Sequence, residues 1–224
     1  MKRAFVYTLP VMIVYLSLGI AYGILMEANG YNAVWSFFTS VFVFAGAAQY
    51  AMVGLLVSLT SPLSVFLIIL ILNARHLFYG ISMMKKYDEL GRVKWYLMLG
   101  LTDETFGLVQ PIDPKSIDNP KRFYFFTTLF NHGYWVVGSV LGGVLGSLIP
   151  IDILGLDFIL TALFVSVFVS QAKNKELIIP AAIGILASFV ALVIFREHFI
   201  LPSMVMIVIS LLFLASKKEV IQNG

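Results

Sequence analysis

Long apolar runs, separated by short polar segments, make up most of this chain. Several runs reach about 20 residues, the length at which an α-helix crosses the hydrocarbon core of a bilayer. The pattern therefore predicts an all-α polytopic membrane protein. We expect helices in the following segments: residues 5–26, 33–59, a third segment led by Ser61 and Pro62, 122–149, 177–195 and 199–216, with another helix that starts near 155.

Small or polar residues interrupt two apolar segments. Residues 44–49, FAGAAQ, indicate either a helix break with free backbone groups beside Gln49, as in many transporters, or a continuous helix whose small face packs on a neighbour. Residues 95–110 are short for a full span and carry Asp103 and Glu104. We expect there a short, tilted or re-entrant element that lines a cavity.

Composition supports the membrane class. The chain is 60% hydrophobic and 12% charged, whereas a soluble domain has about 25% charged residues. The basic start and first apolar run resemble a signal peptide, but the run is long and lacks a small-residue cleavage site, so we interpret it as a retained helix. No polar stretch is long enough for a soluble domain. We therefore predict a single transmembrane domain over residues 1–224.

Basic residues suggest the orientation. If 33–59 and 95–110 each enter and leave on one side, six helices cross, and nearly all basic residues then face the cytoplasm. If both segments cross fully, there are eight spans and the 85–94 loop faces outward. The positive-inside rule favours six, and both arrangements place the two termini in the cytoplasm. The net charge of +3 thus reflects membrane-flanking loops and not a nucleic-acid surface.

Arg75 lies inside an apolar run beside Asn73 and His76. An arginine at bilayer depth costs roughly 3 to over 10 kcal/mol, so we expect it to face the protein interior with an anionic partner. Asp103 is the nearest candidate. Such a pair would suit an amino acid zwitterion, with Arg75 on its carboxylate and Asp103 or Asp157 on its ammonium group. The alternative is a fixed pin between two helices.

Further polar and small residues complete the candidate set. The substrate-binding candidates are Gln49, Asn73, Arg75, Asp103, Asp157 and Thr161, and the proton-coupling candidates are His76, Asp103, Glu104 and Asp157. Glycines four residues apart share one helix face and allow close packing against another helix or a partner subunit. They are Gly19 and Gly23 in the first helix, and Gly138, Gly142 and Gly146 in the fifth.

Enzyme signatures are missing from the sequence. It contains no P-loop, no HExxH zinc motif and no Gly-x-Ser-x-Gly elbow, and it indicates no cofactor. It also has no cysteine, which excludes disulfides and thiolate metal sites. These observations favour transport over catalysis, with no ATP hydrolysis by this chain.

Short motifs in the same regions resemble the AzlC family of branched-chain amino acid exporters. They are FAGAAQ at 44–49, NARHLFYG at 73–80, TDETF at 102–106 and GLDF at 155–158. The resemblance implies a permease in the cytoplasmic membrane that exports leucine, isoleucine, valine or toxic analogues. It also implies a small AzlD-type membrane subunit as partner, for which we consider the glycine face of 122–149 as a docking site. The alternatives are a scaffold that does not transport and a channel-like pore.

Overall fold

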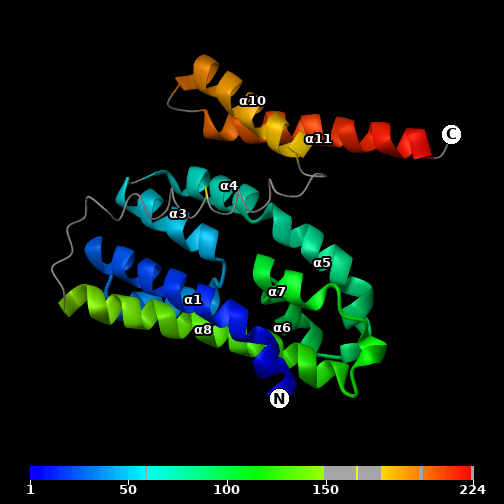
Figure 1. Ribbon diagram of the computed structural model, residues 1–224. Helices are drawn as coiled ribbons and strands as arrows, with labels where there is room; N and C mark the ends of the chain where they lie inside the picture. The colour runs from blue at the N-terminus through cyan, green and yellow to red at the C-terminus, as the bar shows by residue number, and fades with distance from the viewer. Residues whose placement is uncertain (59, 149–164, 166–177, 197–198, 223–224) are drawn as a thin grey trace. The chain divides into compact units, whose positions relative to one another are not determined.

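The structure is a computed structural model that describes residues 1–58, 60–148, 165, 178–196 and 199–222. Within these residues the regular structure is entirely helical, as predicted (Figure 1). The chain divides into two compact units, Met1–Asp157 and Phe158–Gly224, and each is described by itself. The single transmembrane domain stays a prediction.

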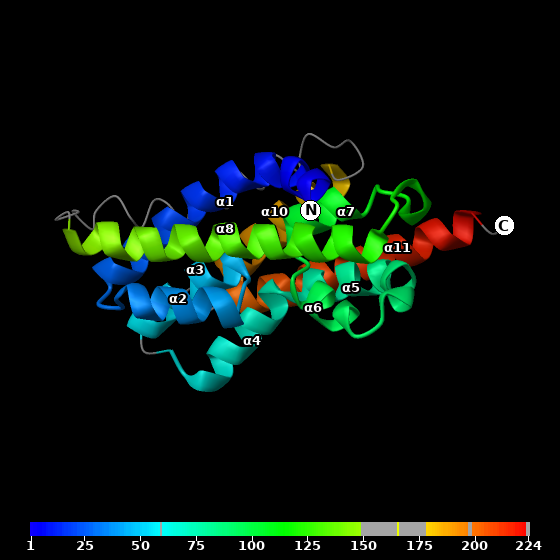
Figure 2. The same cartoon turned by 90° about the horizontal axis from the view of Figure 1, so that it is seen from below.

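The first unit is built around two long helices, α1 (Lys2–Ala28) and α8 (Pro120–Leu148), which lie side by side (Figures 1 and 2). Their glycines face one another. A Cβ atom at Gly23 would overlap the backbone of Ser139, and one at Gly142 would overlap the backbone of Ile20. The prediction of a close helix-packing face is confirmed. Within the described residues α1 occupies this face, and the docking site of a partner subunit stays a prediction.

The segment after α1 is broken. Helix α2 (Ala33–Phe42) ends before Phe44, and α3 (Gly46–Val57) starts just after it. Phe44 has a φ of 40°, in the left-handed region that a phenylalanine rarely adopts. Of the two alternatives that the sequence left open, the helix break is confirmed and the continuous helix is wrong.

The third apolar segment starts as predicted, because Ser61 caps α4 (Pro62–Leu72) and Pro62 occupies its first turn. We expected one continuous helix through Arg75. Instead α4 ends at Asn73, and α5 (Ala74–Tyr87) follows with a bend of 42° between the two pieces. Asparagine has a low helix propensity, which fits its position at the bend.

The short segment after α5 also consists of two pieces. A turn of 3₁₀ helix, η1 (Asp88–Leu90), leads to α6 (Val93–Leu99), and Thr102 then caps α7 (Asp103–Val109). A second 3₁₀ turn, η2 (Pro114–Ser116), leads to α8. The expected short element is thus an interrupted helix pair.

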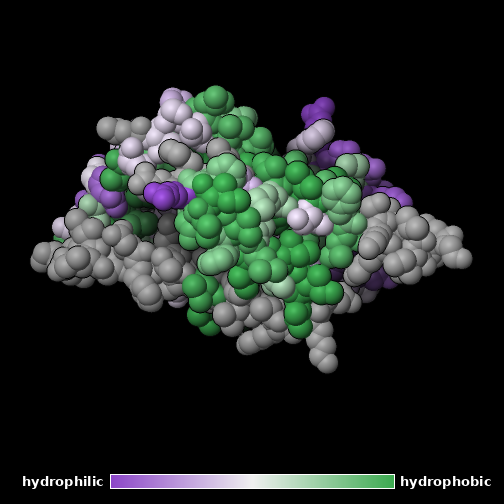
Figure 3. Space-filling view, turned by 90° about the horizontal axis from the view of Figure 1, so that it is seen from above, coloured by the Kyte–Doolittle hydropathy of each residue, from purple (hydrophilic) through white to green (hydrophobic). Residues whose placement is uncertain are grey.

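The second unit contains α10 (Ile178–Phe195) and α11 (Ile200–Gln222), which pack on one another. Both helices begin close to where we expected, but α11 continues beyond Lys217 and Lys218, which we had placed at its end. The surface shown in Figure 3 is mainly hydrophobic. Leu186 and Phe189 of α10 are exposed.

Helix length and composition give a partial test of the membrane spans. Within the described residues, α1 and α10 are long and apolar enough to cross a bilayer, and the bent pair α4–α5 makes a third if it counts as one span. The count of six to eight spans stays a prediction. Asp157, Thr161 and the start of the sixth predicted helix lie outside the residues that the structure describes.

Candidate functional site

The predicted partner of Arg75 is confirmed. Its Nη1 atom lies 2.6 Å from Oδ2 of Asp103, so the first turn of α5 meets the first turn of α7. Both side chains are about one third exposed, at 32% and 31%. The ion pair is therefore partly accessible and not fully enclosed between the helices.

Tyr79 holds the second oxygen of the same carboxylate. Its hydroxyl donates a hydrogen bond of 2.5 Å to Oδ1 of Asp103, and its ring stacks on Phe106 with centroids 4.4 Å apart. Our sequence analysis missed Tyr79. The signal was present, since residues four apart lie on the same face of a helix and Tyr79 follows Arg75 by that spacing.

Polar atoms beside the ion pair lack partners. In the described part of the chain, Nε of Arg75 and Oδ1 of Asn73 are buried without a hydrogen bond. Unsatisfied buried donors and acceptors are uncommon in native proteins and each needs a physical explanation. Here they leave one donor and one acceptor next to an accessible pair of opposite charges, which suits a polar ligand.

Glu104, next to Asp103, faces a different set of groups. Its Oε2 atom accepts a hydrogen bond of 2.7 Å from Tyr15 of α1, and the same tyrosine hydroxyl contacts Thr102. Thr105 continues this network, because it contacts Thr102 at 2.9 Å and accepts from Asn131 of α8 at 3.0 Å. The two neighbouring carboxylates therefore lie in different environments, one accessible and one tied into the α1–α7–α8 core.

Gln49 is completely buried at the α2–α3 break. Its Oε1 atom accepts from the backbone N–H of Ala45 at 3.2 Å and from Nε1 of Trp135 at 2.9 Å, and its Nε2 donates to Ser40. These bonds give Gln49 a structural role at the break. The Ala45 N–H is the backbone group that we expected the break to leave beside Gln49. Its role in substrate binding stays a prediction.

The two helix breaks on either side of Arg75 approach one another. Phe44, in the α2–α3 break, lies edge-on to Tyr15 with ring centroids 6.4 Å apart. A Cβ atom at Gly100, in the α6–α7 break, would lie 3.8 Å from the Phe44 ring. Because Tyr15 bonds to Thr102 and Arg75 pairs with Asp103, the breaks and the bend at Asn73 are linked by contacts in one part of the first unit.

Two histidines of the first unit occupy different places. His76 lies beside the ion pair, half-buried, with its ring 5.8 Å from that of Tyr79. His132 stacks on Phe44 and contacts the hydroxyl of Tyr96 and the backbone carbonyl of Ser40. His76 is therefore the histidine at the candidate site, and His132 links α8 to the ends of α2 and α6.

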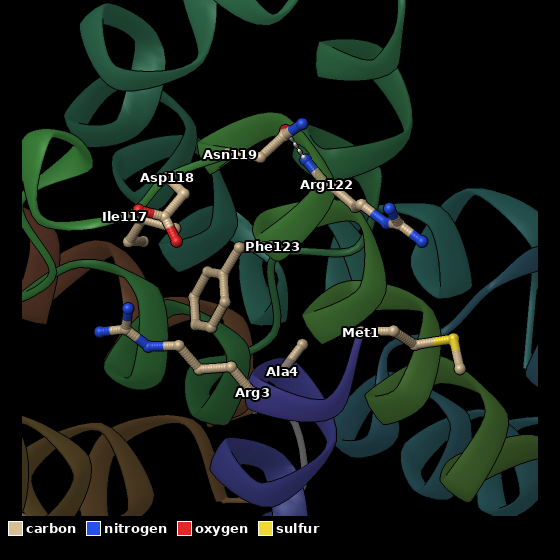
Figure 4. Close-up of a pocket in the computed structure, with 8 residues that line it drawn as sticks. All are labelled: Met1, Arg3, Ala4, Ile117, Asp118, Asn119, Arg122 and Phe123. Atoms are coloured by element: carbon tan, nitrogen blue, oxygen red, sulfur yellow. Dashed lines mark hydrogen bonds between the residues drawn. The ribbon is translucent and has the colours of Figure 1, made fainter.

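A separate pocket lies where α1 and α8 begin (Figure 4). Arg3 and Arg122 line it, but their guanidinium groups point in different directions, and Asp118 lies between Ile117 and Asn119. The arginines do not converge on one point, so this pocket fits a zwitterion less well than the Arg75–Asp103 pair.

Comparisons with known proteins show similarity over most of the chain. Residues 10–149, which include both charged residues, match the family model described as AzlC protein. The chain is 39% identical to the branched-chain amino acid transport protein AzlC of Bacillus subtilis over 208 residues, which cover 92% of this chain and 82% of that protein.

Other relatives are more distant. An uncharacterized membrane protein of Helicobacter pylori strain 26695 is 35% identical over 222 residues, covering 97% of this chain and 96% of its own length. The inner membrane protein YgaZ of Escherichia coli is 29% identical over 192 residues, which cover 80% of this chain and 77% of that protein. No solved structure matches the chain.

Proposed function

The chain belongs to the AzlC family, and we propose that it is a secondary transporter that exports leucine, isoleucine, valine or their analogues across the cytoplasmic membrane. The relative in Bacillus subtilis is named for branched-chain amino acid transport. A small AzlD-type membrane subunit is the expected partner, and both termini are expected in the cytoplasm. The observation that carries this proposal is the accessible Arg75–Asp103 pair with unused polar atoms beside it.

The pair offers complementary charges to the two ends of an amino acid. The substrate carboxylate would accept two parallel hydrogen bonds from the Arg75 guanidinium, a geometry that arginine provides and lysine does not. The ammonium group would take the place of Arg75 on Asp103, while Tyr79 keeps the carboxylate in position. Each charge then exchanges one partner for another, so that neither Arg75 nor Asp103 is left uncompensated.

Glu104 suits the coupling step best among the proton-coupling candidates. It has a hydrogen-bond donor in Tyr15 and lies next to Asp103, yet its contacts are with the helix core and not with Arg75. Burial disfavours the charge of a carboxylate and so favours a bound proton, while the Tyr15 hydroxyl gives the ionised form of Glu104 a partner. We propose that Glu104 carries the proton, while Asp103 contacts the substrate; His76 and Asp157 are the remaining candidates.

Efflux from loaded cells tests the proposal. Dipeptides would supply labelled leucine, isoleucine or valine inside cells, and efflux would be followed with and without this chain and its small partner. We expect efflux that needs the chain and that is lost in Arg75→Ala and in Asp103→Ala, with normal amounts of folded protein in the membrane.

The second ion pair of the first unit provides matched controls. Lys94 and Asp88 lie 3.0 Å apart, and Lys94 is as exposed as Arg75, at 32%. Lys94→Ala and Asp88→Ala remove the same charges away from the site and should leave efflux unchanged. No efflux of any of these amino acids from the wild-type chain with its partner would contradict the proposal and favour a scaffold or another solute.

A further inference from the structure

One face of α5 carries the residues that contact α7. Arg75, Tyr79 and Lys86 are separated by four and seven residues, which places them on a common face of the helix. Arg75 and Tyr79 bind Asp103 at the start of α7. Lys86, in the last turn of α5, contacts the other end of α7, so the two helices run in the same direction (Figure 1).

The ammonium group of Lys86 binds the C-terminal end of α7. Its Nζ atom donates to the backbone carbonyls of Val109, Gln110 and Ile112, at 3.1, 2.6 and 2.8 Å. A lysine ammonium has three hydrogens, so these contacts can use all its donors. The last carbonyls of a helix have no partner within the helix and carry its negative partial charge, which a cation there satisfies.

The surroundings make this end firmer than the end at Asp103. Met83 and Tyr87, on either side of Lys86, belong to a buried cluster with Leu97, Val109 and Tyr124. The side chains of Met83 and Val109 are at most 1% exposed, whereas those of Arg75 and Asp103 are about one third exposed. Lys86 therefore fixes the buried C-terminal end of α7 and leaves the exposed end at Asp103 available to a ligand.

We propose that Lys86 is a positioning residue of the transporter. By holding the C-terminal end of α7 against α5, it sets Asp103 opposite Arg75 and makes the two helices one rigid body. The ion pair alone could not do this, because a substrate that takes over Arg75 and Asp103 leaves only Tyr79, through its hydroxyl and its ring, to link the helices at that end. This inference rests on the proposed function, since it takes the ion pair as the substrate site.

The neighbouring lysine makes a matched control possible. Lys85 is exposed and carries the same charge in the same turn of α5. Of these two lysines, Lys86 is the one whose described hydrogen bonds reach the end of α7. Lys86→Met removes the ammonium group and keeps a long unbranched side chain. Lys85→Met removes the same charge from the same loop, and Lys86→Arg keeps a cation with several donors.

Leucine efflux in these variants measures positioning. We expect Lys86→Met to raise the half-saturating leucine concentration about tenfold, by analogy with metal sites, where removing a residue that orients a ligand costs about 10- to 100-fold. Lys85→Met should match the wild type, and Lys86→Arg should recover most of the effect. A merely structural role would reduce the amount of folded protein and leave the half-saturating concentration of the remainder unchanged, which would overturn the proposal.

A second readout does not depend on transport. The chain has no cysteine, so Tyr79→Cys with Phe106→Cys introduces one thiol on each helix where their rings now stack. We expect a short bifunctional thiol reagent to link them several-fold more slowly when Lys86→Met is added, and at an unchanged rate with Lys85→Met. Equal linking in both backgrounds would overturn the role of Lys86. Slower linking, together with a wild-type chain that moves no amino acid, would support that role and refute the proposed function instead.

Discussion

The α1–α8 interface and the α5–α7 contact, both within the first unit, differ in how tightly they pack and in the groups that meet. Glycines bring α1 and α8 so close that backbone lies on backbone, with no space for a side chain. At the α5–α7 contact, charged and hydroxyl groups meet at helix ends, and part of the ion pair stays exposed. The comparison suggests that continuous helices give this protein its frame, while broken helices supply accessible polar groups where a ligand can bind.

The largest expected effect comes from filling the closed interface. Gly142→Leu would force a side chain into backbone atoms of Ile20, and overpacking costs about 1–3 kcal/mol or more. We expect little folded protein, measured as the monodisperse fraction after detergent extraction. Gly133→Ala on the same helix meets no atom within 4 Å and should fold normally. A well-folded Gly142→Leu variant would show that α1 and α8 do not pack through these glycines.

A moderate loss of stability is expected at the α2–α3 break. Gln49→Met keeps the volume of the side chain but leaves the N–H groups of Ala45 and Trp135 without their acceptor. An unsatisfied buried donor costs about 1–3 kcal/mol. We expect a lower unfolding temperature of the purified protein, with leucine efflux by the folded fraction retained. If stability is unchanged while efflux is lost, Gln49 serves the substrate and not the break.

The smallest effect on the fold is expected from the tyrosine at the ion pair. Tyr79→Phe removes one hydrogen bond to Asp103 and preserves the ring that stacks on Phe106. Because a hydrogen bond to a charged group contributes about 1.5–3 kcal/mol, we expect the half-saturating leucine concentration to rise roughly tenfold or more. Tyr7→Phe, on an exposed part of α1, is the control. An unchanged concentration would mean that Tyr79 does not orient Asp103 for the substrate.

Some of this arrangement could be predicted from the sequence because it follows from the cost of charge and from periodicity. An arginine in an apolar run needs an anion, which led from Arg75 to Asp103. Glycines four residues apart indicated close packing. The FAGAAQ segment indicated a break as one of two alternatives, and only the structure could choose, since packing against Trp135 of α8 decides it.

Other features could not be predicted because they depend on contacts between distant segments. Lys86 looked like one of several basic residues in a loop, and its bonds to the end of α7 become visible only in three dimensions. Tyr15 looked like an ordinary aromatic residue of the first helix until it was found to join Thr102 and Glu104. The bend at Asn73 was missed because the apolar pattern continues through it.

The central claim is that Arg75 and Asp103 bind the substrate and do not simply pin two helices. The most direct test is leucine efflux by the exchanged variant Arg75→Asp with Asp103→Arg. It keeps the attraction between the helices but reverses the charges that a zwitterion would meet in a fixed cavity. We predict a folded protein in the membrane with no restored efflux. Efflux restored to near the wild-type rate would contradict the account and make the pair a structural pin.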